Sequence, residues 1–423
     1  MCEYLISGGK RLVGDVCVDT SKNASLPIIA ACLLTNDEVY LEDLPQITDI
    51  QKMLGLFQSL GGRVLKNGNA TILCSSGVNK YNLASSLVGE IRSSIFLLGP
   101  LLAKCTYAKI AYPGGCNIGK RPIDLHIKGL KSLGVSVIET DDGIMCDASK
   151  FTGGIVHLDM PSVGATENLM MVGAIAKGKS VVILNAAREP EIVDLANFIN
   201  KMGGKVRGAG TSVITVEGVS ELHSVTYKPI KDRIVAGTFM IATAMTGGKI
   251  WLKDVNYEHV FSLILKLRNS GCKIDVKNDI ICIENHRRMF SCPIVSTNPY
   301  PGFPTDLQAQ MLALQTISDG ISVITENLFD SRFKHVPELV KMGAKITTRD
   351  RVAVVRGVEY LHGAKVNAED LRGGAALVLA GLVARGETVV ENIHYIERGY
   401  ECLEQKLSML GAQIERKVEN EKG

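Results

Sequence analysis

The chain has 423 residues, a formal net charge of +3 and only one Trp against 42 Gly. This length predicts two or three domains rather than one core, and the composition is that of a globular protein. No run of about five basic residues marks a nucleic-acid footprint, and no stretch approaches the roughly 18 apolar residues of a membrane span. We therefore expect a protein that binds neither nucleic acid nor membrane.

Eleven cysteines are scattered along the chain without a CxxC pair or a metal-ligand spacing. An odd number of cysteines without such a framework indicates a reducing compartment. The amino terminus has no basic region followed by an apolar run, so it does not look like a secretory signal. The sequence therefore predicts a cytoplasmic protein.

A pattern of amphipathic helix, glycine and alternating strand recurs six times along the chain. Its glycines are Gly61, Gly134, Gly203, Gly271, Gly343 and Gly411, which lie 73, 69, 68, 72 and 68 residues apart. Glycine at this place fits the left-handed position that closes a helix. A nearly constant period indicates six repeated structural units.

A second type of helix, apolar almost all the way round, also recurs once per unit. These helices are expected at 26–34, 95–103, 169–176, 239–245, 311–317 and 375–383. Helices without a polar face are buried. We therefore predict an α/β fold of two inside-out barrel domains, each of three repeated units with buried helices surrounded by sheets and outer helices. Domain 1 is expected at 22–230, and domain 2 at 231–423 with a first strand segment from 1–21.

Charged and polar residues open these buried helices, where free backbone N–H groups and a positive dipole end favour anions. They are Lys22 and Asn23, Arg92, Thr166 and Asn168, Arg233, Asp306, and Arg372. The cations among them oppose the dipole, so their simplest purpose is to bind anions. The alternative for each arginine is a salt bridge to a neighbouring loop.

Four loops between strands and helices, at 114–122, 185–191, 328–333 and 394–400, occupy equivalent places in their repeats. The first loop places Cys116 among glycines, with Lys120 and Arg121 just beyond it. Glycines admit close approach of a ligand, and nearby cations lower the pKa of a thiol. The loop therefore suggests chemistry on an anionic substrate, the alternative being a buried cysteine in a structural turn.

Six segments match one known family in order across essentially the whole chain. They are Ser21–Ala24, Gly114–His126, Pro161–Thr166, Asn185–Asp194, Pro301–Gln310 and Glu397–Tyr400. In these segments the chain resembles the UDP-N-acetylglucosamine 1-carboxyvinyltransferases, the enolpyruvyl transferases that commit UDP-GlcNAc to peptidoglycan synthesis. The resemblance implies two inside-out domains with the substrates between them, and a role in cell-wall biogenesis, cell shape and cell division.

The resemblance also implies a role for each matched residue. Cys116 resembles the cysteine that protonates the methylene carbon of phosphoenolpyruvate and that fosfomycin alkylates, and Asp306 resembles the carboxylate that takes the proton of the sugar 3′-hydroxyl. Lys22 and Arg398 complete the expected catalytic group. The expected phosphoenolpyruvate ligands are Lys22, Asn23, Arg121, Arg332, Arg372 and Arg398. The expected UDP-GlcNAc ligands are Asn23, Arg92, Arg121, Pro122, Ile123, Asp124, Leu125, Ser162, Val163, Gly164, Asp306 and Leu328.

This chemistry explains the residue types. Adding an alcohol across an enol ether requires an acid at one carbon and a base near the attacking oxygen. The guanidinium fork matches the carboxylate and phosphate of phosphoenolpyruvate, which favours arginine at most positions. We expect phosphoenolpyruvate and UDP-GlcNAc as the only substrates, fosfomycin as a covalent inhibitor at Cys116, and no metal or organic cofactor.

Some interpretations stay open at individual residues. Asp306 begins a buried helix, where an acidic N-cap is ordinarily structural, and 162–164 could be a plain turn. His126 is expected to stabilise its loop rather than to transfer protons. The roles of Glu189 and Glu191 are left open, since both could be helix-start acids.

The chain departs from the family at two positions, and two other functions remain possible. Val235 stands where an acidic residue is common, which puts in doubt a salt bridge across the interdomain region, and Ser21 replaces the usual Ala. One alternative is a UDP-GlcNAc-binding paralogue without turnover, against which the intact catalytic residues argue. The other is a 5-enolpyruvylshikimate 3-phosphate synthase, which lacks the Gly-Gly-Cys loop and therefore differs at Cys116.

Overall fold

The protein is described by a computed structural model for residues 2–83, 88–89, 91–112, 114 and 123–418. These residues form two compact units. Unit 1 holds the described residues of Met1–Asp19 and Lys231–Gly423, and unit 2 holds those of Thr20–Cys116 and Arg121–Ile230. No helix in these ranges combines the length and the hydropathy that crossing a bilayer takes.

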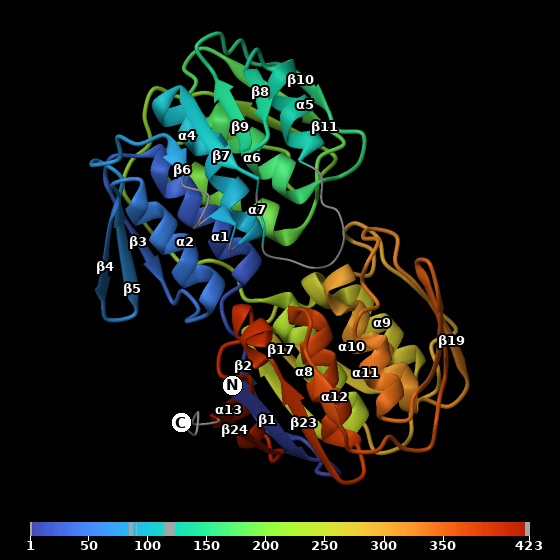
Figure 1. Ribbon diagram of the computed structural model, residues 1–423. Coiled ribbons are helices and arrows are strands. Elements are labelled where there is room, and N and C mark those ends of the chain that lie inside the picture. The colour runs from blue at the N-terminus through green and yellow to red at the C-terminus, as the bar shows by residue number, and fades with distance from the viewer. Residues whose placement is uncertain (1, 84–87, 90, 113, 115–122, 419–423) are drawn as a thin grey trace. The chain divides into compact units, whose positions relative to one another are not determined.

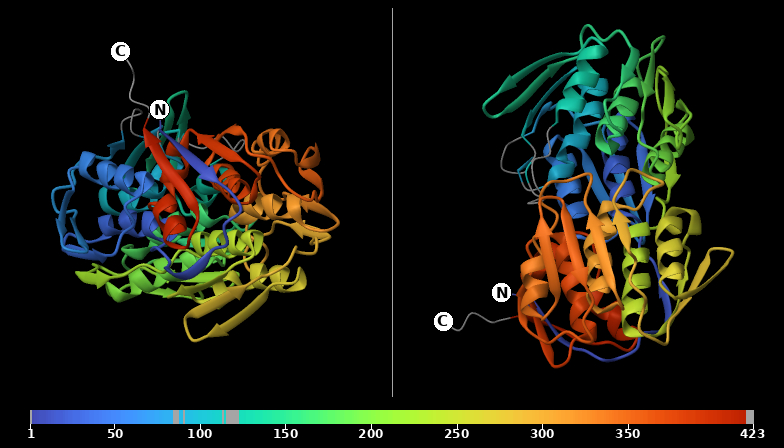
Figure 2. Two further views of the ribbon diagram at one scale, coloured as in Figure 1. Left: turned by 90° about the horizontal axis from the view of Figure 1, so that it is seen from below. Right: turned by 90° about the vertical axis from the view of Figure 1, so that its right-hand side faces the viewer.

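Each unit contains three four-stranded sheets built on one plan. Two neighbouring strands run parallel and are joined in most repeats by a central helix, and the other neighbours are antiparallel. A parallel pair needs such a crossover, whereas antiparallel neighbours can be joined by a tight turn. Figures 1 and 2 show the strands of each unit lying around its helices. The predicted fold of helices surrounded by sheets is confirmed.

Unit 2 contains the repeats nearest the amino terminus. Its sheets are β14 (Val225–Tyr227), β3 (Glu38–Glu42), β5 (Ala70–Cys74) and β4 (Arg63–Asn67); β6 (Asn82–Leu83), β7 (Tyr107–Ala111), β9 (Gly143–Asp147) and β8 (Ser136–Thr140); and β10 (Gly154–His157), β11 (Ser180–Leu184), β13 (Val213–Glu217) and β12 (Lys205–Arg207). Its central helices are α1 (Lys22–Ala31) with η1 (Cys32–Leu34), η2 (Arg92–Leu97) with α4 (Leu98–Cys105), and α6 (Val163–Ala174). Its outer helices are α2 (Thr48–Ser59), α5 (Asp124–Ser132) and α7 (Pro190–Lys201).

Unit 1 repeats the plan. Its sheets are β22 (Lys365–Asn367), β23 (Glu387–Glu391), β1 (Cys2–Ser7) and β24 (Gln413–Val418); β16 (Lys273–Lys277), β17 (Ile280–Glu284), β15 (Lys249–Lys253) and β2 (Val13–Cys17); and β18 (Ile294–Ser296), β19 (Ile321–Thr325), β21 (Val352–Arg356) and β20 (Lys345–Arg349). Its central helices are α8 (Arg233–Thr246), η4 (Thr305–Leu307) with α10 (Gln308–Ile317), and α12 (Leu371–Val383). Its outer elements are η3 (Tyr257–Val260) with α9 (Phe261–Asn269), α11 (Val336–Lys341), and η5 (Ile393–Arg398) with α13 (Leu403–Met409).

The amino-terminal segment completes unit 1. The segment 1–21, expected as the first strand segment of domain 2, contains two strands that lie in two different sheets. β1 pairs antiparallel with β23 and β24, and β2 pairs parallel with β15. The chain thus enters unit 1 first, builds unit 2, and returns to unit 1.

The central helices form the core of each unit. In unit 1, α8, α10 and α12 contact one another, and every residue of α12 up to Leu382 is buried. These helices begin several residues before the apolar stretches that predicted them. The reason is that their polar first turns are buried as well, as at Lys22 and Arg372.

The six repeat glycines have the backbone conformation that the sequence predicts. Their φ angles are +104°, +86°, +100°, +109°, +94° and +98° at Gly61, Gly134, Gly203, Gly271, Gly343 and Gly411. Each follows the last turn of an outer helix, where a left-handed residue closes the helix and turns the chain back toward the sheet. L-residues rarely adopt this conformation, so the glycine signal fixed the repeat length correctly.

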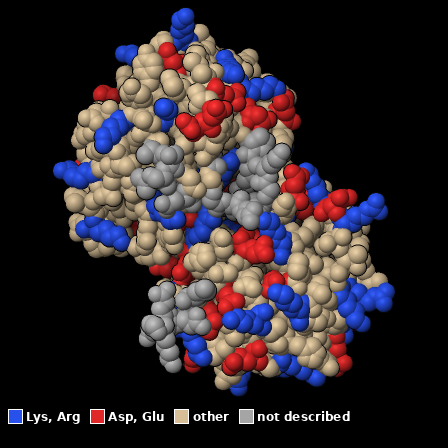
Figure 3. Space-filling model, viewed as in Figure 1, with Lys and Arg blue, Asp and Glu red and all other residues tan. Residues whose placement is uncertain are grey.

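The surface is mixed in charge. Lys and Arg side chains are interspersed with Asp and Glu on the exposed face of each unit in Figure 3. Several pair across neighbouring strands, for example Lys249 with Glu284 at 2.9 Å and Lys365 with Glu391 at 2.8 Å. Such exposed pairs contribute at most about 1 kcal/mol each, so the buried helices carry the stability of the fold.

Candidate active site

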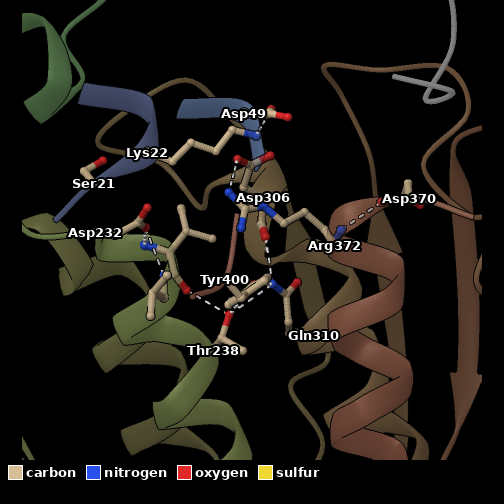
Figure 4. Close-up of polar contacts among 12 residues, drawn as sticks. Ser21, Lys22, Asp49, Asp232, Thr238, Asp306, Gln310, Asp370, Arg372 and Tyr400 are labelled. Carbon is tan, nitrogen blue, oxygen red and sulfur yellow. Dashed lines mark hydrogen bonds and ion pairs between the residues drawn. The ribbon is translucent and has the colours of Figure 1, made fainter. Parts of the chain in front are cut away.

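In unit 1, Asp306 lies between two arginines. Arg332 Nη2 donates to its Oδ1 over 2.5 Å, and Arg372 Nη2 donates to its Oδ2 over 3.0 Å. The arginine side chains are only 4% and 3% exposed, whereas the Asp306 side chain is 25% exposed. Figure 4 shows Arg372 reaching Asp306 from the first turn of α12. The carboxylate is thus fixed on both oxygens while part of it faces solvent.

The charge of Arg372 is secured by its surroundings. Burial alone would lower the pKa of Arg372, but the carboxylate of Asp306, together with Tyr400 and Asp232, more than offsets burial and raises this pKa. Asp232 and Asp370 cap the amino termini of α8 and α12 by accepting backbone N–H bonds. These acids complement helix dipoles that the neighbouring arginines oppose.

The interpretation of Asp306 as a helix cap is wrong. Its side chain accepts from the two arginines, and neither η4 nor α10 has a side-chain capping bond. Arg332 and Arg372 were expected to bind anions of the substrate. In the structure each makes a salt bridge with Asp306. Arg332 Nε, Arg372 Nε and Arg372 Nη1 are buried and have no hydrogen-bond partner among the described residues.

A polar network inside unit 1 supports the Asp306 turn. Gln310 Nε2 donates to the Asp306 carbonyl over 3.0 Å and to the Tyr400 hydroxyl over 3.1 Å. The Tyr400 hydroxyl lies 2.9 Å from Thr238 Oγ1, and the Arg372 guanidinium stacks 5.5 Å from the Tyr400 ring centroid. Figure 4 shows the three central helices joined through these side chains. These contacts tie the Asp306 turn and Arg372 to the buried central helices of unit 1.

Two further predicted residues of unit 1 are Leu328, which follows β19, and Arg398, which follows β23. Leu328 is half-buried, and its amide donates to Glu326 Oε1 over 2.9 Å. Arg398 ends η5 and is also half-buried. Both lie on segments that follow strands of unit 1, as the sequence predicts for loops that carry function.

In unit 2, Lys22 occupies the first position of α1. Its ammonium pairs with Asp49 Oδ2 over 2.7 Å, and the two side chains are 11% and 4% exposed. Ser21, which replaces the usual Ala, caps the same helix by accepting from the Ala24 amide over 3.2 Å. Asn23 is half-buried beside it. The substitution at Ser21 thus supplies a cap that alanine cannot make.

The segment 162–164 is a helix start rather than a plain turn. Ser162 caps α6 by accepting from the Ala165 amide over 3.4 Å, and Val163 and Gly164 form the first turn. A Cβ on Gly164 would lie 3.2 Å from His126 Cε1, so glycine allows the close packing of α5 on α6. The exposed N–H groups of such a first turn suit a phosphate.

His126 belongs to this packing and lies in α5 rather than in a loop. It is buried, and its Nδ1 lies 3.0 Å from Asn168 Nδ2. Burial, reinforced by the charge of Arg92, lowers the pKa of His126 to about 3. The ring is therefore neutral at physiological pH, and its Nδ1 contacts an amide group. Asn168 also accepts from the Gly99 amide over 2.6 Å, and Thr166 accepts from the Ala187 amide over 3.1 Å, so these two residues serve the core of unit 2.

We expect the stability of unit 2 to fall less at acidic pH when His126 is replaced with glutamine. The unfolded ring titrates near its ordinary pKa of 6.5 and the folded ring near 3. The stabilisation from the neutral ring is therefore complete above pH 6.5 and is lost as pH falls, by about 2 kcal/mol between pH 8 and 5. Hydrogen exchange of α5 and α6 amides at both pH values measures this. An equal pH dependence in His126→Gln would contradict the assignment, and His157→Gln, at an exposed site, is the control.

The remaining predicted residues lie at the start of η2, near the start of α5, or outside the described residues. Arg92 opens η2 and is half-buried, Ile123 is buried, Asp124 is the exposed first residue of α5, and Leu125 is half-buried. Cys116, Arg121 and Pro122 lie outside the described residues. Val235 is buried within α8 at 2% exposure, so it makes no salt bridge.

A buried carboxyl in α6 was not anticipated. Glu167 is fully buried, and neither of its oxygens has a hydrogen-bond partner among the described residues. Burial, and then the nearby charges of Glu191 and Glu189, raise the pKa of Glu167 well above its ordinary value. Among the described residues no three acidic, His or Cys side chains gather as metal ligands. Burial therefore favours the protonated form of Glu167.

We expect Glu167→Gln to change how stability depends on pH. The unfolded carboxyl ionises above its ordinary pKa of 4.5, whereas burial raises the pKa of the folded carboxyl and favours its protonated form. Wild-type stability is therefore complete below that pKa and is lost as pH rises, by about 1.4 kcal/mol per pH unit up to the raised folded pKa. The glutamine variant lacks this slope. Hydrogen exchange of α6 amides at pH 6 and 8 measures how far the pH dependence of the variant departs from that of wild type. The exposed control Glu221→Gln should show the same pH dependence as wild type.

Several residues of the site carry no individual signal in the sequence. Asp49 reads as an ordinary acid in the first turn of α2, yet it pairs with Lys22. Glu326 follows β19 and reads as a loop residue, yet it is fully buried. Gln310 gives a usable signal, because an amide inside an apolar helix indicates a buried polar network.

The chain is similar over its length to known transferases. The family model described as EPSP synthase (3-phosphoshikimate 1-carboxyvinyltransferase) matches residues 6–407. A protein of Caldanaerobacter subterraneus named UDP-N-acetylglucosamine 1-carboxyvinyltransferase 2 is 47% identical over 416 residues, covering 98% of this chain and 100% of the relative. One of Symbiobacterium thermophilum, named UDP-N-acetylglucosamine 1-carboxyvinyltransferase 1, is 48% identical over 98% of this chain and 95% of its own.

Solved structures share the fold. The enolpyruvyl transferase NikO from Streptomyces tendae superposes with a TM-score of 0.86 at 23% identity, covering 98% of both chains. EPSP synthase from Acinetobacter baumannii superposes with a TM-score of 0.77 at 17% identity, covering 99% of this chain and 100% of that chain. At these identities the likeness concerns the fold.

Proposed function

Because the chain belongs to the UDP-N-acetylglucosamine 1-carboxyvinyltransferases within the EPSP synthase family, we propose that it transfers the enolpyruvyl group of phosphoenolpyruvate to the 3′-hydroxyl of UDP-GlcNAc and releases phosphate. This is the first committed step of peptidoglycan synthesis. The observation that carries the proposal is the full-length similarity to relatives of that name. The buried arginine pair around Asp306 supports it, since it provides a fixed carboxylate beside cations.

The proposed reaction is an addition followed by an elimination. The Cys116 thiol gives its proton to the methylene carbon of phosphoenolpyruvate, which becomes a methyl group. The sugar oxygen bonds to the adjacent carbon as its proton passes to Asp306. In the second step the methyl group gives a proton back to the Cys116 thiolate and the carbon–oxygen bond to phosphate breaks, which restores the double bond and frees phosphate. An acid and a base each contribute about 10²- to 10⁴-fold in such reactions.

The cations are assigned to the acidic donor. We assign Lys22, Arg121 and Arg398, with Asn23 beside them, to the phosphate and carboxylate of phosphoenolpyruvate. Arg332 and Arg372 orient Asp306 first. Arg332 Nε, Arg372 Nε and Arg372 Nη1, which have no partner among the described residues, extend the same field. Lys22 would exchange its Asp49 pair for the phosphate, a stronger hydrogen-bonding anion.

UDP-GlcNAc is assigned to the first turn of α6 and to the segments that precede and open α5. Backbone N–H groups of a helix start bind phosphates well, and Ser162, Val163 and Gly164 form such a start. The other proposed ligands are Asn23, Arg92, Arg121, Pro122, Ile123, Asp124, Leu125, Asp306 and Leu328. The sugar 3′-hydroxyl would lie at Asp306.

We also propose that the enzyme works in the cytoplasm, that fosfomycin inactivates it by alkylating Cys116, and that its loss impairs cell shape and division. All ten cysteines within the described residues are free thiols, which suits a reducing compartment. A catalytic thiol would have to stay reduced as well.

The test is phosphate release from phosphoenolpyruvate with either UDP-GlcNAc or shikimate 3-phosphate as acceptor, with and without fosfomycin. We expect phosphate release with UDP-GlcNAc alone, and fosfomycin should abolish it. Mass spectrometry should find the fosfomycin adduct on the wild-type protein but not on the Cys116→Ala control, which is inactive with or without the drug. Release with shikimate 3-phosphate would favour the sister activity. Binding of UDP-GlcNAc without release would favour the non-catalytic paralogue.

A further inference from the structure

Glu326 is a fully buried carboxylate that the proposed reaction does not use. It directly follows β19 in unit 1. Its Oε1 accepts from Thr297 Oγ1 over 2.9 Å, from the Leu328 amide over 2.9 Å and from the Phe329 amide over 3.2 Å. Its Oε2 accepts from Thr305 Oγ1 over 2.8 Å. One side chain therefore ties together three separate stretches of unit 1.

The first tie leads directly to Asp306. Thr305 is the residue before Asp306 and the first residue of η4. Its hydroxyl is fixed by Glu326, so the turn that carries Asp306 is anchored from its amino-terminal side. Gln310 holds the same turn from its carboxyl-terminal side through the Asp306 carbonyl.

The second tie leads to Arg332. The amides of Leu328 and Phe329 both donate to Glu326 Oε1, which fixes the start of the 328–333 loop. The Arg332 guanidinium lies 5.3 Å from the centre of the Phe329 ring and donates to Asp306 Oδ1. Both ties therefore end at the same ion pair of Asp306 and Arg332.

The charge of Glu326 suits this task. Within the described residues all its hydrogen-bond donors are neutral and no cation pairs with it. A carboxylate accepts from several donors at once, and bonds to an ionised acceptor are roughly twice as strong as neutral ones. A glutamine in its place can present only one acceptor oxygen, and its amide group faces Thr305 as a donor.

We propose that Glu326 is a positioning residue of the transfer reaction: through Thr305 it holds Asp306, and through the Leu328 and Phe329 amides it holds Arg332 and the loop assigned to UDP-GlcNAc. The inference rests on the proposed function. A displacement of about 1 Å at a reacting group can cost about a hundredfold in rate, which is the scale on which such a tie matters.

The test separates the two ties by kinetics. Thr305→Val removes only the bond to Oε2, so we expect kcat to fall by about 10- to 100-fold with the KM for UDP-GlcNAc unchanged. Thr305→Ser keeps the hydroxyl and should recover kcat to within about threefold. Glu326→Gln weakens both ties, so kcat should fall and the KM for UDP-GlcNAc should rise. Rates are expressed per site titrated with fosfomycin, so that unfolded protein does not count.

The control is Glu338→Gln, another buried carboxylate of unit 1. Glu338 accepts from the Asn367 amide and from Lys341, and neither is a proposed site residue. If Glu326 had a purely structural role, Glu326→Gln and Glu338→Gln would both lower the melting temperature. Neither variant would then lower kcat per titrated site. Wild-type kcat and KM in Thr305→Val and Glu326→Gln would overturn the proposal.

A second measurement does not depend on turnover. If wild type releases no phosphate with UDP-GlcNAc, the proposed function fails. Hydrogen exchange then tests by itself whether Glu326 fixes the Leu328 and Phe329 amides. Exchange at the Leu328 and Phe329 amides should quicken by at least about tenfold in Glu326→Gln, which corresponds to about 1.4 kcal/mol, and stay unchanged in Glu338→Gln. Unchanged exchange in both variants would overturn the proposal.

Discussion

Replacing Asp306 with asparagine is expected to lower kcat by about a thousandfold, because an amide cannot take the proton of the attacking hydroxyl. The shape of the side chain is kept, and the amide oxygen can still accept from one of the two arginines. Binding of UDP-GlcNAc should change little, since most of its proposed contacts lie elsewhere. Steady-state phosphate release and calorimetric binding of UDP-GlcNAc measure the two effects.

Three controls guard against a trivial loss of Asp306→Asn activity through misfolding. Asp319→Asn makes the same chemical change at an exposed site just beyond the other end of α10 and should keep full activity. Alkylation of Cys116 by fosfomycin needs no base at Asp306, so mass spectrometry should still find it in Asp306→Asn. Asp306→Glu keeps a negative charge between the arginines and reports on position. Turnover within tenfold of wild type in Asp306→Asn would mean that another group takes the proton.

Much of the fold is readable from the sequence because two of its requirements are local. A left-handed residue must follow each outer helix, and glycine meets that need at six places with positive φ. The central helices are buried on nearly all sides, so each contains a largely apolar stretch, as in α8 and α12. Both patterns repeat once per unit, so even a weak signal at one repeat is strengthened by the other five.

The limits of the central helices are less predictable. Apolar stretches indicated starts at 169 and 375, whereas α6 and α12 begin at Val163 and Leu371. Their first turns contain polar side chains that are buried through partners distant in sequence, such as His126 for Asn168. Hydropathy cannot separate a buried polar helix start from an exposed loop.

In the site, too, some features could be predicted from the sequence and others could not. Asp306 follows from a matched motif, Arg332 from its loop and Arg372 from its place at the start of a buried helix. Their mutual ion pairs do not follow from the sequence, because the arginines are 26 and 66 positions away from Asp306. The sequence offered anion binding or a salt bridge as alternatives for the cations. The structure shows salt bridges for Lys22, Arg332 and Arg372. Glu326 lies outside every motif, and its contacts could not be predicted because its donors come from three separate stretches of the chain.

Replacing Arg372 with lysine is expected to lower kcat by about 10- to 100-fold. Arg372 donates to Asp306 Oδ2 and stacks on Tyr400. A lysine keeps the charge but has neither the planar group that stacks nor the fork that holds a carboxylate. Losing a charge-assisted bond costs about 1.5–3 kcal/mol, which is the expected loss in transition-state stabilisation. Phosphate release at varied phosphoenolpyruvate and UDP-GlcNAc concentrations measures kcat and both KM values.

The pattern of kinetic change distinguishes the two roles open to Arg372. If it only orients the base, kcat falls and the KM for phosphoenolpyruvate stays constant, because substrate binding is untouched. If its buried N–H groups without partners among the described residues also hold phosphoenolpyruvate, that KM rises by a similar factor. Arg385→Lys is the matched control, since Arg385 stacks on Tyr360 at 3.6 Å on the surface of unit 1 and contacts no proposed site residue. Wild-type kinetics in Arg372→Lys would leave Arg332 as the sole arginine that Asp306 requires, and both assignments of Arg372 would fall.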